Sequence, residues 1–172
     1  MPTVEQLSAA LSAEANLELS EALDRIRHCL RQLSDEQIWS RSRPDMNGVG
    51  NLLLHLSGNL RQWIVAGLGG EADVRHRSSE FTEQGPIPRA ELQSRLEEAV
   101  RTTQETLLRM TPDEWFRTRR IQGFDVSGMH ALWHTVPHFR GHTQEIVHQT
   151  RELLGPAYQF AWQPATVEQG AP

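Results

Sequence analysis

Four histidines recur at intervals of four residues in the segment MHALWHTVPHFRGHTQEIVH, as His130, His134, His138 and His142. Residues four apart share one face of a helix, so two neighbouring imidazoles of this row could bind one metal ion. His55, in NLLLHLSGNLRQW, could supply a third ligand. Three neutral imidazoles with open coordination positions suit Zn²⁺, Ni²⁺ or Fe²⁺ and leave room for water or substrate. Such a set is typical of a catalytic rather than a structural metal site.

Helical geometry selects one pair from the row. At about 100° per residue, the apolar residues of this segment centre about 100° away from His138. His142 lies about 40° from His138 on the core side, whereas His134 and His130 lie about 40° and 80° from it on the side away from the core. We therefore predict His138 and His142 as ligands. Pro137 removes one helical hydrogen bond and is expected to bend the helix just before this pair.

His55 lies at the edge of its own apolar stripe, about 60° from Leu52. Two edge positions on different helices can meet at one end of a helical interior. Glu145 falls at the histidine edge of the last helix and is predicted as an outer partner of the ligands. Each histidine taken alone also suits a packing or solvent-facing role, and His28 and His76 are predicted to lie at the surface without a role. Spacing by itself therefore leaves both interpretations open.

Several other chemistries lack the residues that they need. The 138/142 pair has Phe139 where a zincin-type metalloprotease needs a glutamate. All 17 basic residues are arginine, so neither a Schiff-base lysine nor a P-loop lysine exists. The sequence has no nucleophile elbow, glycine-rich phosphate loop or cysteine cluster. Cys29, the one cysteine, cannot form an internal disulfide and falls at a core-type position.

The elements that must position these histidines are helices. Apolar residues recur three or four apart in four long stretches, which predict helices over residues 3–33, 48–67, 88–110 and 127–154. Ser127 is predicted as the N-cap of the last helix, and Gly155-Pro156 is predicted to end it. Residues 35–39 predict one more helical turn.

The remaining segments carry weaker patterns. We predict an exposed connection over residues 69–88, an irregular segment over 117–128 and an irregular tail from about 156. The tryptophans are predicted to serve packing; they are Trp39, Trp63, Trp115, Trp133 and Trp162.

Four amphipathic helices bury their apolar stripes most simply against each other, which predicts an all-α fold, a four-helix bundle, as a single domain over residues 1–172. The chain has 172 residues and a net charge of −5, which argues against a nucleic-acid partner. No apolar run approaches the length of a membrane span, and the N-terminal segment does not resemble a signal peptide. A reducing, cytoplasmic location is the expectation.

The segments NLLLHLSGNLRQWIVAGLGG and HFRGHTQEIVHQTRELLG resemble the two signature helices of the DinB/YfiT-like superfamily of metalloenzymes. The resemblance implies a four-helix bundle, often dimeric, with a divalent metal at one end bound by His55, His138 and His142. Relatives include thiol-dependent S-transferases and a mycothiol-dependent maleylpyruvate isomerase. Many members carry HRGQ or HTGQ at the last ligand, whereas Thr143, Gln144 and Glu145 follow His142 here.

The resulting expectation is a metal-dependent enzyme with thiol-dependent S-transferase chemistry. It would use a divalent metal, a low-molecular-weight thiol and a small-molecule substrate, as a homodimer. A second interpretation is a dimeric binding or stress-response module without catalysis. A third is metal-dependent hydrolysis, for which Glu145 would be the candidate general base.

Overall fold

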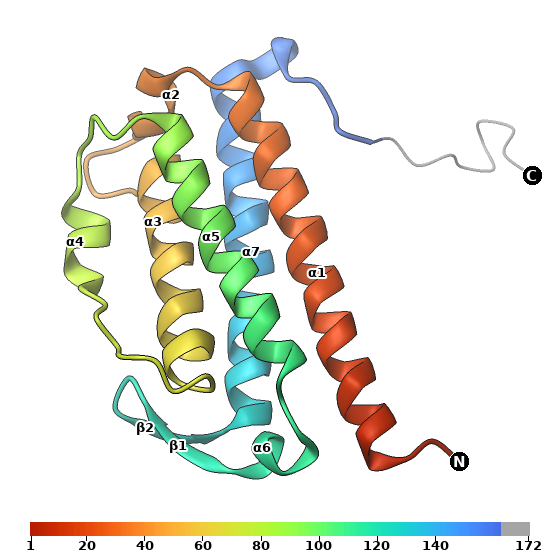
Figure 1. Ribbon diagram of the computed structural model, residues 1–172. Coiled ribbons are helices and arrows are strands. Elements are labelled where there is room, and N and C mark those ends of the chain that lie inside the picture. Colours follow the sequence, from red (N-terminus) through yellow and green to blue (C-terminus); the bar gives the residue numbers. More distant parts are fainter. Residues whose placement is uncertain (163–172) are drawn as a thin grey trace, which may run out of the picture.

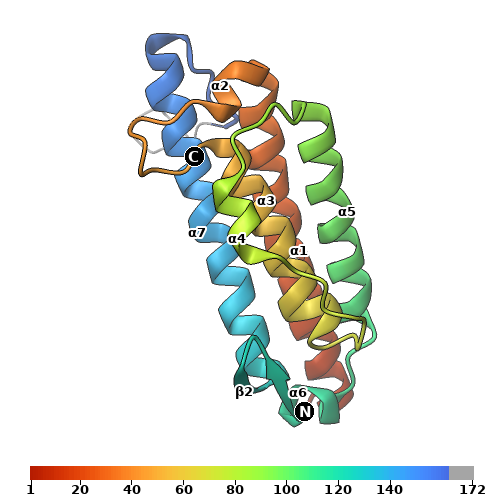
Figure 2. The same cartoon turned by 90° about the vertical axis from the view of Figure 1, so that its left-hand side faces the viewer.

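The computed structural model describes residues 1–162 and is mostly helical in that part of the chain (Figure 1). Its long helices run side by side in both views (Figures 1 and 2). They are α1 (Val4–Gln32), α3 (Val49–Leu60), α5 (Arg89–Leu108) and α7 (Gly128–Leu154). This mostly helical structure is broadly consistent with the predicted all-α class, and a long helix lies at each of the four predicted positions. The extra turn is also present, as α2 (Asp35–Trp39).

Local sequence signals begin and end these helices. The side chain of Thr3 accepts a hydrogen bond from the Gln6 amide, and the Gln6 side chain accepts one from the Thr3 amide, which is a capping box at the start of α1. Ser127, the predicted N-cap of α7, accepts from the His130 amide at 3.1 Å. Gly155, with φ of 51°, ends α7 and opens the short 3₁₀ turn η2 (Gly155–Ala157).

One hydrophobic core lies among the four long helices. The first and last helices, α1 and α7, pack along each other, and the Arg140 guanidinium lies 2.7 Å from the Glu18 carboxylate across this contact. The side chains buried deepest include Phe139, Leu19, Ile26, Leu30, Leu52, Leu56, Leu60 and Leu96. Cys29 is fully buried, as its core-type position predicts.

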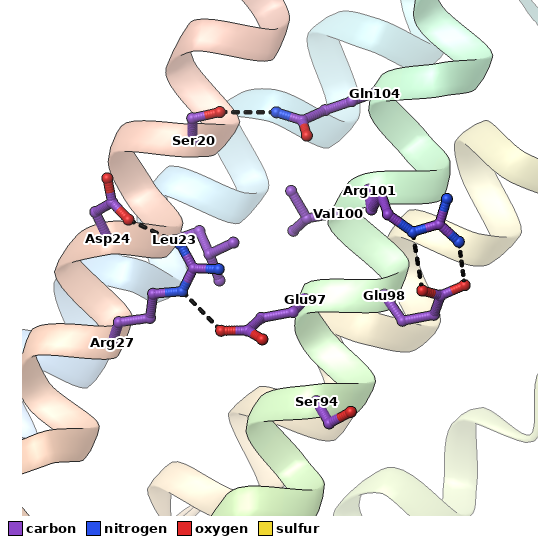
Figure 3. A pocket seen from close by; sticks show the side chains of 10 residues that line it. All are labelled: Ser20, Leu23, Asp24, Arg27, Ser94, Glu97, Glu98, Val100, Arg101 and Gln104. Carbon is purple, nitrogen blue, oxygen red and sulfur yellow. Dashed lines mark hydrogen bonds and ion pairs between the residues drawn. The ribbon is translucent and has the colours of Figure 1, made fainter.

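Polar side chains tie α1 to α5 along a surface groove (Figure 3). The Gln104 amide donates to the Ser20 hydroxyl at 2.7 Å. Further along the groove, the Arg27 guanidinium donates to the Glu97 carboxylate at 2.7 Å. The polar groups of α1 and α5 are thus hydrogen-bonded to each other across the groove. We call this line of contacts the seam between α1 and α5.

The predicted exposed connection over residues 69–88 is only partly correct. It contains α4 (Arg77–Thr82), which lies beside α3 (Figure 2). Most of the connection is exposed, but Glu80 is buried. A helix of six residues is too short to show periodicity, so the sequence does not reveal it.

The segment predicted to be irregular over residues 117–128 follows α6 (Pro112–Phe116) and forms an antiparallel hairpin of β1 (Thr118–Ile121) and β2 (Phe124–Ser127). Gln122 and Gly123 both have positive φ, 51° and 85°, as a tight hairpin turn requires. Ile121 and Val126 bury against the helices. The strands are too short for alternation to stand out in the sequence.

The second predicted helix has nearly its predicted extent but two helix types, and the role predicted for the tryptophans needs correction. The second long helix continues past Leu60 as a π-helical segment, η1 (Arg61–Ala66), which periodicity does not distinguish from α-helix. Trp133 and Trp162 are 65% and 74% exposed, so the prediction that they serve packing is wrong, whereas Trp63 and Trp115 are buried and Trp39 packs against the core.

The remaining expectations concern the surface and the tail. His76 is exposed, as predicted, but His28 is half-buried with its Nε2 2.5 Å from the Gln159 carbonyl oxygen. Residues 158–162 form no regular element, as expected, and the rest of the predicted tail lies outside the described residues. Within residues 1–162, no helix has both the length and the apolar character needed to cross a bilayer.

Candidate metal centre

Three histidines meet between α3 and α7. His55 comes from α3, and His138 and His142 come from successive turns of α7. One ring nitrogen of each lies within 4.8 Å of the others, which is close enough for all three to bind one metal ion. The Nε2 atoms of His55 and His138 are 2.9 Å apart. The structure therefore brings together the trio that helical spacing selects.

Glu80 of α4 fixes the far side of the His55 ring. Its Oε2 lies 3.0 Å from His55 Nδ1, and both side chains are buried. Burial acts to raise the pKa of Glu80, but hydrogen bonds from Arg75 and His55 outweigh it and hold this pKa below its ordinary value. Arg75 Nη2 lies 3.1 Å from the same Nδ1 but already donates to Glu80 Oε2 at 2.8 Å. Because an ionised carboxylate can only accept, we assign the Nδ1 proton of His55 to the hydrogen bond with Glu80. The lone pair of His55 is left on Nε2, facing the other two histidines.

Arg75 holds that carboxylate in place. Its Nε and Nη2 donate to the two oxygens of Glu80 at 2.7 and 2.8 Å, which is a bidentate pair, and its side chain is 3% exposed. Its Nη1 donates to Gln62 Oε1 at 2.9 Å. The guanidinium thereby links η1, α4 and the Glu80 that orients His55.

A second carboxylate holds His142. Glu145, one turn later on α7, places Oε2 2.7 Å from His142 Nδ1, the outer-partner position that its place on the helix predicts. His142 is thereby left with Nε2 as its free ligand atom. Two of the three histidines thus have a carboxylate on the ring nitrogen away from the cluster, which is the usual arrangement around metal-bound imidazoles.

Burial keeps the third histidine neutral. It lowers the pKa of His138 to about 4, and the neighbouring His142 and His55 add to the effect. At neutral pH the imidazole is therefore uncharged, as a metal ligand must be. The Nε2 atoms of His55 and His138, 2.9 Å apart, are close enough for one cation to contact both. The donor set fits a divalent metal with nitrogen ligands.

The neutral His138 predicts a pH dependence for the metal-free protein. Its pKa is about 4 in the folded protein and lies at the ordinary histidine value of 6.5 in the unfolded chain, which therefore binds an extra proton between these values. The free energy of unfolding should fall as the pH drops from 6.5 toward 4. Urea unfolding in a chelator at several pH values measures this, and His138→Asn should flatten the slope. If the free energy of unfolding depended on pH as steeply in the variant as in the wild type, His138 would not be its source.

The other two histidines of the row lie apart from the cluster. His130 is exposed. His134 is half-buried, with its ring stacked on that of Trp63 at 3.8 Å between centroids and lying 5.7 Å from the His138 ring. Although His134 lies on the side of α7 away from the core stripe, Trp63 of η1 covers it. Its exclusion from the ligand set agrees with the geometry.

Sequence reasoning misses Arg75 and Glu80. Both lie in a polar stretch with many charged residues, and nothing in their spacing distinguishes them from a solvated connection. Phe81, also missed, packs its ring 4.9 Å from that of His55, and the Arg77 guanidinium lies 5.0 Å above the Phe81 ring. These contacts depend on how α4 docks on α3.

The described chain is thus a mostly helical protein with a partly buried, carboxylate-supported three-histidine cluster between two of its helices. It matches over residues 8–167 the family described as "Protein of unknown function (DUF1572)", and it belongs to that family. No curated protein matches it.

Proposed function

We propose that the protein is a divalent-metal-dependent enzyme of the DinB-like superfamily, with its long helices forming a four-helix bundle of the DinB/YfiT-like type in a single domain. The observation that carries the proposal is the cluster itself. Three imidazole nitrogens lie within 4.8 Å of one another, and carboxylates hold two of the rings from behind. A set of three imidazoles leaves coordination positions for an exchangeable ligand.

The chemistry we propose is thiol-dependent group transfer. A Zn²⁺, Ni²⁺ or Fe²⁺ ion bound by His55, His138 and His142 would act as a Lewis acid and lower the pKa of a thiol. Cys29 is buried on α1 and does not belong to the cluster. The thiol would therefore be a low-molecular-weight cofactor, acting on a small-molecule substrate.

The proposal includes a homodimer in the reducing cytoplasm, a setting that the single, buried cysteine suits. The surroundings of the cluster disfavour metal-dependent hydrolysis, because a hydrolase needs a free general base near the metal ligands. Glu80 and Glu145, the carboxylates in contact with the cluster, are both engaged with ligand histidines. Binding of metal without thiol would favour the second interpretation, a binding or stress-response module without catalysis.

The direct test is whether a bound metal accepts an external thiol. In the Co²⁺-substituted protein, adding small thiols should produce a saturable charge-transfer band in the near ultraviolet. His142→Ala should abolish the band, and Cys29→Ala should keep it, since the buried thiol is not the ligand. A Co²⁺ protein whose spectrum no small thiol changes would rule out the transferase proposal.

A second prediction separates a catalytic from a structural ion. The core among the long helices is built without the cluster, so chelation should lower Tm only by mass action, by an amount that depends on metal concentration and affinity. The helical circular dichroism signal should persist at room temperature. Loss of that signal on chelation would show that the ion is structural.

A further inference from the structure

We propose that Glu80, Arg75 and Gly58 form a positioning device for His55, through which metal binding and docking of the segment that lies along α3 stabilise each other. We call this segment, residues 71–83, the strap; it includes α4 and lies along α3 (Figure 2). The inference rests on the proposed function, because it takes the three histidines as metal ligands.

The first observation is the burial of a complete ion pair. The side chains of Arg75 and Glu80 are 3% and 8% exposed. Removing both charges from water is costly, and an apolar pair of similar volume often serves stability equally well. What an apolar pair cannot do is accept the Nδ1 proton of His55, which Glu80 does at 3.0 Å. We therefore infer that this ion pair is buried because Glu80 must reach and orient His55.

The second observation is that the strap has another anchor. The Asn51 side-chain amide donates to the backbone carbonyls of Glu80 and Glu83 at 3.0 and 2.8 Å. Arg41 also donates to the Glu83 carbonyl, at 2.8 Å. These bonds hold the strap by its backbone. The Glu80 carboxylate is thus left to act on His55.

The third observation is the space that Gly58 leaves. It lies on α3 almost one turn after His55, and a Cβ there would overlap the Glu80 carboxylate and come within 2.9 Å of Arg75 Nε. Glycine inside a helix costs about 1 kcal/mol relative to alanine. The absence of a side chain at this position is what admits the ion pair beneath the strap.

These contacts couple the strap to the metal. With its Nδ1 proton held by Glu80, His55 keeps Nε2 directed at the other ligands, so a cation finds the ring already oriented. A bound cation in turn fixes the ring that Glu80 contacts. Because coupling between two equilibria is reciprocal, the metal should protect the strap as much as the strap strengthens metal binding.

The decisive variant replaces the ion pair by apolar side chains, as Arg75→Met combined with Glu80→Leu. It should fold with a Tm close to that of the wild type, while Zn²⁺ affinity, measured by competition with a chelator, falls about 10–100-fold. Its Co²⁺ absorption spectrum should also change. Gly58→Ala keeps all three histidines and both charges, and it should also lower the affinity for Zn²⁺.

The matched control is Glu97→Gln, which breaks the Arg27 pair in the seam between α1 and α5 (Figure 3). It should leave Zn²⁺ affinity unchanged. Hydrogen exchange of residues 71–83 should slow when Zn²⁺ binds to the wild type, and the metal should have little effect on these amides in the double variant.

The outcomes separate the two proposals. A wild-type protein that binds no Zn²⁺ contradicts the proposed function itself. A wild type that binds, with a folded double variant that binds equally tightly and shows the same Co²⁺ spectrum, overturns the positioning device alone. If the double variant does not fold, the other two measurements test the positioning device. An unchanged Zn²⁺ affinity in Gly58→Ala, together with hydrogen exchange of the strap that Zn²⁺ does not slow in the wild type, would overturn it.

Discussion

Alanine in place of any one of His55, His138 or His142 is expected to remove the metal from the purified protein. The wild type should carry about one divalent ion per chain. Each substitution takes one of three nitrogen ligands that lie within 4.8 Å of one another, and the remaining pair offers too few protein ligands to retain an ion through purification. Elemental analysis of protein prepared without a histidine tag or added metal measures the content.

The neighbouring histidines supply the controls. His130→Ala and His134→Ala should keep the metal, because the first side chain is exposed and the second is stacked on Trp63 outside the cluster. If His134→Ala abolished binding while His142→Ala did not, the ligand pair would lie one turn earlier on α7.

The second large effect concerns stability. Phe139, next to a ligand on α7, is 1% exposed among the long helices. Phe139→Ala should lower the free energy of unfolding by about 3–5 kcal/mol, because it removes apolar surface and leaves a cavity. Urea unfolding in the presence of a chelator measures this without a contribution from metal.

Trp133→Ala is the matched control for that variant. Trp133 is larger but 65% exposed on the same helix, so its loss should change the free energy of unfolding by only about 0.5 kcal/mol. Equal losses from the two variants would mean that α7 presents a different face to the core.

The long helices and the histidine trio could be predicted because each rests on a pattern within one helix. Apolar spacing marks the buried face of α7, and the same spacing places His138 and His142 at its edge. His55 follows from the stripe of α3. In each case a few residues on a single element carry the information.

The parts that could not be predicted depend on contacts between elements. Glu80 and Arg75 lie in a polar connection, and only the docking of the strap on α3 buries them beside His55. His134 points away from the core stripe of its own helix, yet Trp63 on η1 covers it. The hairpin of β1 and β2 is set by a tight turn and strands too short to show a period.

The pairing of the first long helix with the last affects how the chain folds during synthesis. During translation α1 leaves the ribosome before the other long helices described. In contrast, α7, which packs along α1 and carries two of the three clustered histidines, emerges after them. Until then the apolar face of α1 lacks this partner, and His55 stands alone. Because such distant contacts close late, the nascent chain should remain sensitive to proteases and available to chaperones until α7 has emerged. The histidine cluster is therefore completed only after α7 has emerged, when His138 and His142 can join His55.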